Sequence, residues 1–247
     1  MSGHSKWSTI KHKKGRADAA RGRLFTRLIK EVTIAARMGG GSEESNPRLR
    51  SAVATAKANN MPSDNITRAI KKGTGELEGV SYDEITYEGY GPEGVAILVE
   101  CLTDSKNRCV SEVRQAFSKH NGKMAEPGAV AWVFNETGRV IVEGEVDEEQ
   151  LMEVALEAGA GDFESDEGSH TIFCATDAIE AVREACEAAG WTVTEAGRIK
   201  VPSNTVEVSG RPAVVLMKLL SALEDLDDTQ DLWANFEMDD SLLESLA

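Results

Sequence analysis

The densest cluster of basic side chains lies at the N-terminus, and its chemistry is that of a phosphate contact. The cluster comprises Lys6, Trp7, Lys11, His12, Lys13, Lys14 and Arg16. Lysine and arginine release counterions from a nucleic-acid backbone, and a tryptophan among them stacks on a base or anchors to a core. These residue types predict a nucleic-acid contact, and a merely solvated basic tail is the alternative.

A basic stripe is predicted to continue along the first helix. Apolar residues recur at helical spacing after Asp18, and glycines 39–41 end the run. Five cations on this helix fall within about 40° of one line, opposite the apolar residues: Arg16, Arg23, Arg27, Lys30 and Arg37. We therefore expect a packed face and an exposed basic face about 30 Å long, comparable to a duplex turn. Glu31 lies off the stripe, where it could pair with Arg27.

Two further groups of cations are weaker candidates. The third predicted helix carries Asn65, Arg68, Lys71 and Lys72, which would reach base edges in a helix-turn-helix. The preceding turn lacks the glycine often found in that motif, so a generic bundle is favoured. The second group, which does not share one helix face, lies between Ser105 and Lys123; from it we take Arg108 and Arg114 as candidate contacts.

No arrangement typical of an enzyme is recognisable. The four histidines are scattered, and the glycine-rich turn at 89–94 lacks the ending of a phosphate loop. Asp225, Asp227, Asp228 and Asp231 cluster without the spacing of a calcium loop. The four cysteines make no C-x-x-C pair and are expected to be reduced and mostly buried. We therefore expect no catalysis, metal, cofactor or small-molecule substrate.

The opposite charges of two parts of the chain indicate where a polyanion binds. The formal net charge is −15, yet residues 1–75 hold 16 basic and 5 acidic side chains. The remaining residues hold 11 basic and 37 acidic ones. We expect the acidic body to repel a phosphate backbone, so that only the N-terminal end docks.

The same composition excludes a membrane protein. No stretch approaches the about 20 apolar residues that cross a bilayer. The N-terminus also lacks the apolar run of a signal peptide. We expect a cytoplasmic monomer with no membrane partner.

The order of the predicted elements indicates how the chain is divided. Three short amphipathic helices come first, the second capped by Asn46 with Pro47 at its first position. Past Gly75 the predicted order is ββαβ, with strands at 85–87, 95–99 and 130–134. A complete β-α-β-β-α-β unit follows, as in ferredoxin-like folds, and then a final helix and strand.

The incomplete pieces on either side of that unit must cover each other's apolar faces. We therefore predict an α+β multidomain fold, with an N-terminal three-helix bundle and two α/β ferredoxin-like domains, one inserted into the other. The predicted domains are the basic nucleic-acid-binding bundle at 1–77, a discontinuous domain at 78–135 and 205–247, and an inserted domain at 136–204.

Distinctive motifs occur along essentially the whole chain. They are Gly3-His4-Ser5-Lys6-Trp7, Ile10-Lys11-His12-Lys13-Lys14, Leu24-Phe25-Thr26, Gly39-Gly40-Gly41, Asn46-Pro47-Arg48-Leu49-Arg50, Asn60-Met61-Pro62, Tyr87-Glu88-Gly89-Tyr90-Gly91-Pro92 and Asn107-Arg108 with Glu112-Val113-Arg114. These motifs resemble those of the YebC/PmpR family. Ser105 stands where that family usually has asparagine, and Asn121 where it usually has glycine.

The resemblance implies a three-domain fold and a role in gene expression. Members are described mostly as DNA-binding transcriptional regulators, which would contact promoter regions through the N-terminal domain. Others resemble translation activators that act at the ribosome, notably where proline-rich stretches stall synthesis. The alternative function is therefore a ribosome-associated translation factor that binds rRNA and relieves stalling, because phosphate contacts look alike on DNA and rRNA.

Overall fold

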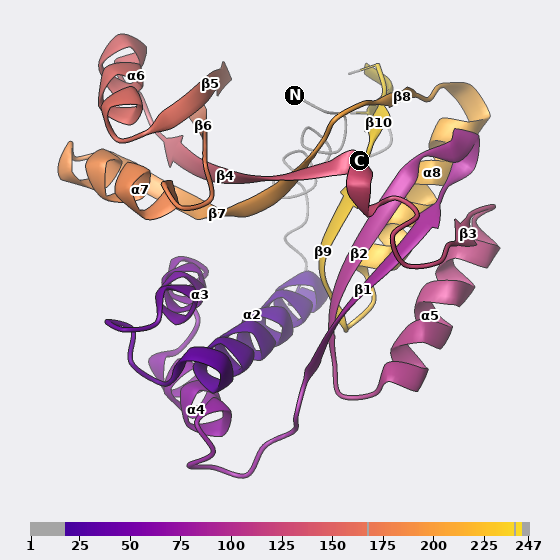
Figure 1. The fold of residues 1–247 in the computed structure, drawn as a ribbon, viewed down its shortest axis with the longest axis horizontal. Helices are drawn as coiled ribbons and strands as arrows, with labels where there is room; N and C mark the ends of the chain where they lie inside the picture. Colours follow the sequence, from indigo (N-terminus) through magenta and orange to yellow (C-terminus); the bar gives the residue numbers. More distant parts are fainter. Residues whose placement is uncertain (1–17, 167, 240, 244–247) are drawn as a thin grey trace. The chain divides into compact units, whose positions relative to one another are not determined.

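The computed structural model describes residues 18–166, 168–239 and 241–243, and has an α+β fold (Figure 1). The described chain forms two compact units. The first takes the residues up to Ala52, Met61–Phe134 and the residues from Pro202 onward; the second takes Val53–Asn60 and Asn135–Val201. The finer division into the three domains given above stays a prediction.

The N-terminal helices are α2 (Asp18–Gly39), α3 (Pro47–Ala58) and α4 (Ser63–Gly73). The predicted cap at Asn46 is confirmed, because its Oδ1 accepts the backbone N–H of Leu49 at 3.1 Å. Its Nδ2 also donates to the carbonyl oxygens of Ala35 and Gly40, both at 2.8 Å. One side chain therefore provides hydrogen-bond partners for backbone groups at the end of α2 and at the start of α3.

Helices α2 and α4 approach very closely at Gly73. A Cβ atom at this position would lie 2.3 Å from the carbonyl oxygen of Thr33 and 2.7 Å from the Cβ of Ala36. Only glycine fits such an approach of two backbones. The buried residues Ile66 and Ala69 of α4 continue this contact side of the helix.

A four-stranded sheet forms the centre of the first unit. Its order is β3 (Lys123–Met124), β1 (Asp83–Tyr90), β2 (Ala96–Thr103) and β9 (Thr229–Ala234). Strands β1 and β2 form an antiparallel hairpin, as predicted, across the 3₁₀ turn η1 (Pro92–Gly94). Strand β9 pairs with β2 although well over 100 residues separate them in the sequence. A short parallel pair joins β8 (Val206–Glu207) to β10 (Phe236–Glu237).

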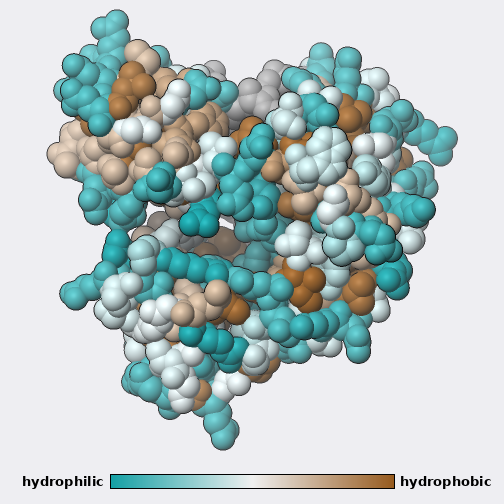
Figure 2. Space-filling view, viewed as in Figure 1, coloured by the Kyte–Doolittle hydropathy of each residue, from teal (hydrophilic) through white to brown (hydrophobic). Residues whose placement is uncertain are grey.

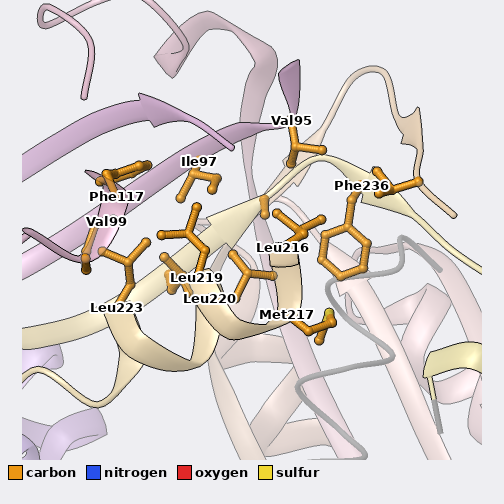
Figure 3. Packing of buried hydrophobic residues seen from close by; sticks show 14 of the residues in the cluster. Val95, Ile97, Val99, Phe117, Leu216, Met217, Leu219, Leu220, Leu223 and Phe236 are labelled. Atoms are coloured by element: carbon orange, nitrogen blue, oxygen red, sulfur yellow. The ribbon is translucent and has the colours of Figure 1, made fainter. Parts of the chain in front are cut away.

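Helices α5 (Lys106–Lys119) and α8 (Gly210–Glu224) cover one face of this sheet (Figure 1). Alternate residues of β2 point toward them, as its period of two requires. Figure 3 shows the resulting core, in which side chains of α8 meet β2 and Phe117 of α5. The labelled buried residues are Val95, Ile97, Val99, Phe117, Leu216, Met217, Leu219, Leu220, Leu223 and Phe236.

The opposite face is covered by a loop and not by the predicted strand at 130–134. The structure has a 3₁₀ turn, η2 (Ala131–Val133), before β4 begins at Phe134, so that prediction is wrong. The carboxylate of Glu88 accepts the backbone N–H groups of Gly128, Val130 and Ala131 at 2.6, 2.7 and 2.9 Å. Because a side chain satisfies these donors, the segment needs no strand partner.

The second unit contains the β-α-β-β-α-β order that the sequence predicts. Its elements are β4 (Phe134–Glu143), α6 (Glu148–Glu157), β5 (Ala160–Asp166), β6 (Ser169–Cys174), α7 (Ile179–Ala188) and β7 (Thr192–Pro202). The sheet order β5-β6-β4-β7 is that of a ferredoxin-like fold. Apolar residues gather over α6 and α7 in Figure 2. Met152 and Leu156 of α6 are exposed.

Candidate nucleic-acid interface

Part of the predicted basic face of α2 points toward acidic residues of the first unit itself. The cations concerned are Arg23, Arg27 and Lys30. The N-terminal candidates Lys6, Trp7, Lys11, His12, Lys13, Lys14 and Arg16 lie outside the described residues. The structure therefore places four of the predicted helix cations, and three of them have partners at the end of α8 or just beyond it.

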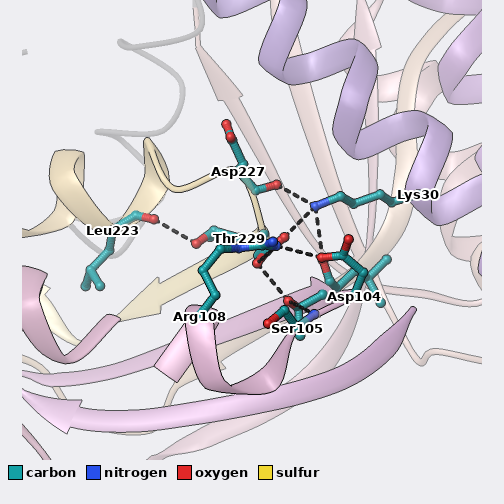
Figure 4. Close-up of polar contacts among 10 residues, drawn as sticks. Lys30, Asp104, Ser105, Arg108, Leu223, Asp227 and Thr229 are labelled. Carbon is teal, nitrogen blue, oxygen red and sulfur yellow. Dashed lines mark hydrogen bonds and ion pairs between the residues drawn. The ribbon is translucent and has the colours of Figure 1, made fainter. Parts of the chain in front are cut away.

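Lys30 is the most deeply buried of these cations, with 6% of its surface exposed. Its Nζ donates to Asp228 Oδ1 at 2.7 Å, to the carbonyl oxygen of Asp227 at 2.8 Å and to that of Leu102 at 3.2 Å. Figure 4 shows Lys30 reaching toward Asp227 among the residues that surround Thr229. All three ammonium protons thus have acceptors, which is what a buried lysine requires.

Asp228 is the second centre of this network. Its Oδ2 accepts the hydroxyl of Thr103 at 2.7 Å and Nη2 of Arg108 at 2.8 Å. Burial by itself would raise the pKa of Asp228, but the hydrogen bonds from Lys30, Arg108 and Thr103 outweigh it and lower the pKa below its usual value. A carboxylate with this many donors remains ionised at neutral pH.

Arg23 and Arg27 contact the last turn of α8. Arg27 donates to the carbonyl oxygen of Glu224, and Arg23 forms an ion pair with Asp225 at 3.1 Å. Burial lowers the pKa of Arg27. The carbonyl groups at a helix C-terminus carry partial negative charge, so cations are stabilised there.

Arg37, Arg108 and Arg114 complete the candidates that the structure describes. Arg37 is exposed and donates to Ser81 Oγ at 2.5 Å. Arg108 is engaged with both Asp104 and Asp228. Arg114 is exposed, and its side chain has no hydrogen bond or ion pair within the described residues.

The prediction of one exposed basic face on α2 is therefore wrong at Lys30, and Arg27 is partly buried as well. The expected pairing of Glu31 with Arg27 is also replaced, because Glu31 accepts two hydrogen bonds from Arg48. A helical wheel gives the direction of a side chain but not the identity of what packs there. Nucleic-acid binding by the α2 residues stays a prediction.

The bundle has a different exposed basic face, on α4. Arg68, Lys71 and Lys72 are exposed, at i, i+3 and i+4 spacing, and their side chains have no hydrogen bond or ion pair within the described residues. We call these three residues the α4 basic face. They stand opposite the buried Ile66 and Ala69. The sequence pattern makes them candidates for base contacts but favours the longer stripe on α2.

The residues that the structure describes hold neither a candidate metal site nor a candidate membrane-spanning helix. The described residues contain no group of three or more His, Cys, Asp or Glu side chains placed to hold a metal ion. The four cysteines are free and buried, as expected. Among the described helices, none is long and apolar enough to cross a membrane.

Comparisons with known proteins match the whole chain. Residues 5–76 match the family model described as the TACO1/YebC protein N-terminal domain, and residues 82–236 match that of the TACO1/YebC second and third domain. A probable transcriptional regulatory protein of Geobacter sulfurreducens is 54% identical over 100% of both chains. One of Desulfotalea psychrophila is also 54% identical, again over 100% of both chains.

A solved structure agrees with these matches. The crystal structure of a conserved hypothetical protein from Aquifex aeolicus is 45% identical to this chain and superposes with a TM-score of 0.84. The match covers 90% of this chain and 93% of the other. The chain belongs to the TACO1/YebC family, which is the YebC/PmpR family that its sequence motifs indicate.

Proposed function

We propose that this protein is a non-enzymatic, DNA-binding regulator of transcription that docks through its basic N-terminal region. The observation that carries the proposal is the α4 basic face, whose three cations have no partner within the described residues. The names of the relatives, which are probable transcriptional regulatory proteins, support the same role. We further propose that it acts in the cytoplasm as a monomer.

The α4 basic face suits a phosphate backbone for a physical reason. Its side chains are free to release counterions, whereas Lys30 on α2 already directs its donors to acceptors within the protein. Residues 1–75 also carry a large excess of positive charge, which attracts a polyanion from a distance. The predicted contacts at Lys6 to Arg16 would add to this positive charge.

The test is the salt dependence of binding to genomic DNA fragments. We expect Arg68→Ala with Lys71→Ala and Lys72→Ala to lower the slope of log K against log salt by about 0.9 for each phosphate that is no longer neutralised. A matched control makes the same change in net charge elsewhere, by Gln150→Glu with Ala181→Glu and Ala188→Glu. These control positions are exposed on α6 and α7. An unchanged slope in a folded α4 variant would refute the proposed interaction.

Footprinting and sedimentation then distinguish DNA from rRNA as the partner of the protein. Protected sites on promoter fragments, absent with the α4 variant, are the expected result. Co-sedimentation with ribosomes through a sucrose gradient, without any preferred site on DNA, would instead overturn the transcriptional role and support the translation factor.

A further inference from the structure

A second group of unpaired cations lies on the body, at the end of α5 and along α8. Arg211, Val215 and Lys218 recur at i, i+4 and i+7, which places them on one face of α8. Arg211 and Val215 line a surface depression with Glu93 and Asn121. Lys119 and Lys218 are exposed and have no partner within the described residues. This face of α8 therefore adjoins the segment that follows α5.

The end of α5 lies against α8, because a Cβ atom at Gly122 would be 2.9 Å from Cδ1 of Phe117 and 3.0 Å from Cδ2 of Leu219, the residue after Lys218. Burial, followed by the nearby charges of Lys119 and Lys218, lowers the pKa of His120. Two lysines from different helices thus lie close to one imidazole. Neither lysine has a carboxylate partner within the described residues, so their positive charge is uncompensated, which favours an anionic ligand.

The cations continue onto the edge of the sheet at Lys123. Asn121 has a φ of 57°, in the left-handed region, and turns the chain from α5 into β3. Lys123 is then directly opposite Tyr90 in the antiparallel pair of β3 and β1. Residues directly opposite in such a pair share one face of the sheet, so Lys123 and Tyr90 are neighbours.

Two exposed aromatic rings lie close to each other here: that of Tyr90, the neighbour of Lys123, and that of Trp132. Tyr90 Oη and Trp132 Nε1 both donate to the carbonyl oxygen of Ala129, at 3.1 and 3.0 Å. Trp132 is 70% exposed and Tyr90 is 40% exposed. Their polar atoms are satisfied by the protein, and the loop that carries Trp132 is fixed by Glu88. The rings are therefore held in place while their faces remain open to solvent.

We propose that Lys119, Lys123, Lys218, Tyr90 and Trp132 form a second binding surface, which takes single-stranded nucleic acid. We call it the lysine–aromatic surface. Its lysines neutralise phosphates, and Trp132 stacks on an unpaired base. The bases of a duplex are already stacked on each other, so an exposed indole selects a single strand. The inference rests on the proposed function only in taking nucleic acid as the partner.

The experiment compares two probes of the same length, of about 12 nucleotides. One is oligodeoxythymidine, and the other has the same sugar-phosphate chain without bases. We expect Trp132→Ala in the full-length protein to weaken binding of oligodeoxythymidine about 5- to 150-fold and to leave binding of the abasic probe unchanged. Trp132→Phe, which keeps an aromatic ring, should restore most of the affinity.

The lysines should behave differently from the tryptophan. Lys119→Ala with Lys218→Ala should weaken the binding of both probes. It should also lower the slope of log K against log salt by about 0.7 for each phosphate that is no longer neutralised. The matched control is Lys106→Ala with Arg198→Ala, which removes the same charge. Lys106 lies at the other end of α5 and Arg198 in the second unit.

Each other outcome overturns a specific claim. If wild-type and Trp132→Ala protein bind both probes with the same affinity, Trp132 does not stack on a base and the proposed stacking site is refuted. If the control pair of substitutions reduces the affinity as much as the lysine pair does, the effect comes from net charge alone and not from a defined surface. If the wild-type protein binds duplex DNA through α4 but no single strand, the lysine–aromatic surface fails while the proposed function stands. If it binds no nucleic acid at all, both fail.

Discussion

Helices α2 and α4 are both basic and amphipathic, yet their cations have opposite fates. On α2, Arg23, Arg27 and Lys30 bind the end of α8 and the residues beyond it. On α4, Arg68, Lys71 and Lys72 bind nothing among the described residues. A cation that is paired inside the protein contributes to folding, whereas a free cation is available to a partner. The same residue types are thus paired inside the protein on α2 and left free on α4 for the nucleic-acid contact that we propose.

The difference follows from where each helix packs. Helix α2 runs beside the negative C-terminal end of α8, and the aspartates after that end continue the negative charge. Helix α4 is held against α2 by the close approach at Gly73, which involves no charge. Its opposite side therefore remains free.

The largest expected effect is on stability, at the buried pair of Lys30 and Asp228. Asp228→Ala leaves the ammonium of Lys30 buried without its carboxylate, so we expect the free energy of unfolding to fall by about 3–5 kcal/mol. Urea denaturation measures it. Asp225→Ala, which removes the exposed partner of Arg23, is the control. An effect at Asp228 no larger than at Asp225 would show that the network does not hold α2 in place.

The approach of α4 to α2 is tested by two matched substitutions of glycine. Gly73→Ala places a methyl group against the Thr33 carbonyl oxygen, and we expect it to cost about 1–3 kcal/mol. Gly22→Ala in α2 meets no atom within 4 Å and should stabilise the helix by about 0.5–1 kcal/mol. Thermal unfolding of both variants shows whether each substitution raises or lowers the stability. Stabilisation by Gly73→Ala would contradict the close packing.

Acid should weaken the interaction of α2 with Asp228 selectively. Because the pKa of Asp228 is lowered in the folded state, its contribution is present at neutral pH. The contribution disappears as the pH falls below the ordinary aspartate range, about 4, and through the lower folded value. Urea unfolding of wild type and Asp228→Asn across this range should therefore give curves that converge in acid. Parallel curves would exclude Asp228 as a source of the acid sensitivity.

The smallest effects are expected at exposed cations on each helix. Arg23→Ala breaks a solvent-exposed ion pair and should cost about 0.2–1 kcal/mol. Arg68→Ala breaks no hydrogen bond or ion pair among the described residues and should change stability by less than about 0.5 kcal/mol. The same two proteins should rank in the opposite order in a DNA-binding assay. A larger decrease in DNA affinity at Arg23 would reverse the roles assigned to the two helices.

Local signals in the sequence predict much of this fold. Asn46 followed by Pro47 marks a helix start by capping chemistry, and the structure places the cap there. The alternation of strand and helix after Phe134 predicts the ferredoxin-like order of the second unit. Both depend on residues near in sequence, where spacing and chemistry suffice.

The features that the sequence pattern does not predict depend on residues far apart in the chain. The continuous apolar run at 130–134 is typical of a buried strand, but two of its backbone N–H groups donate to Glu88, about 40 positions away in the sequence. The aspartates after α8 form no recognisable motif in the sequence, and only the fold brings Asp228 to Lys30. Which cations are free can be decided only after these long-range pairs are known.

Glu88 has one more consequence, for hydrogen exchange. Three amides that belong to no strand ladder, those of Gly128, Val130 and Ala131, are tied to one carboxylate. Their exchange with solvent deuterium therefore requires this carboxylate to release them. The three amides should exchange together, although they sit in a loop, and so report each opening of the segment that carries Trp132. A loop thus acquires the cooperativity that is usually associated with a sheet.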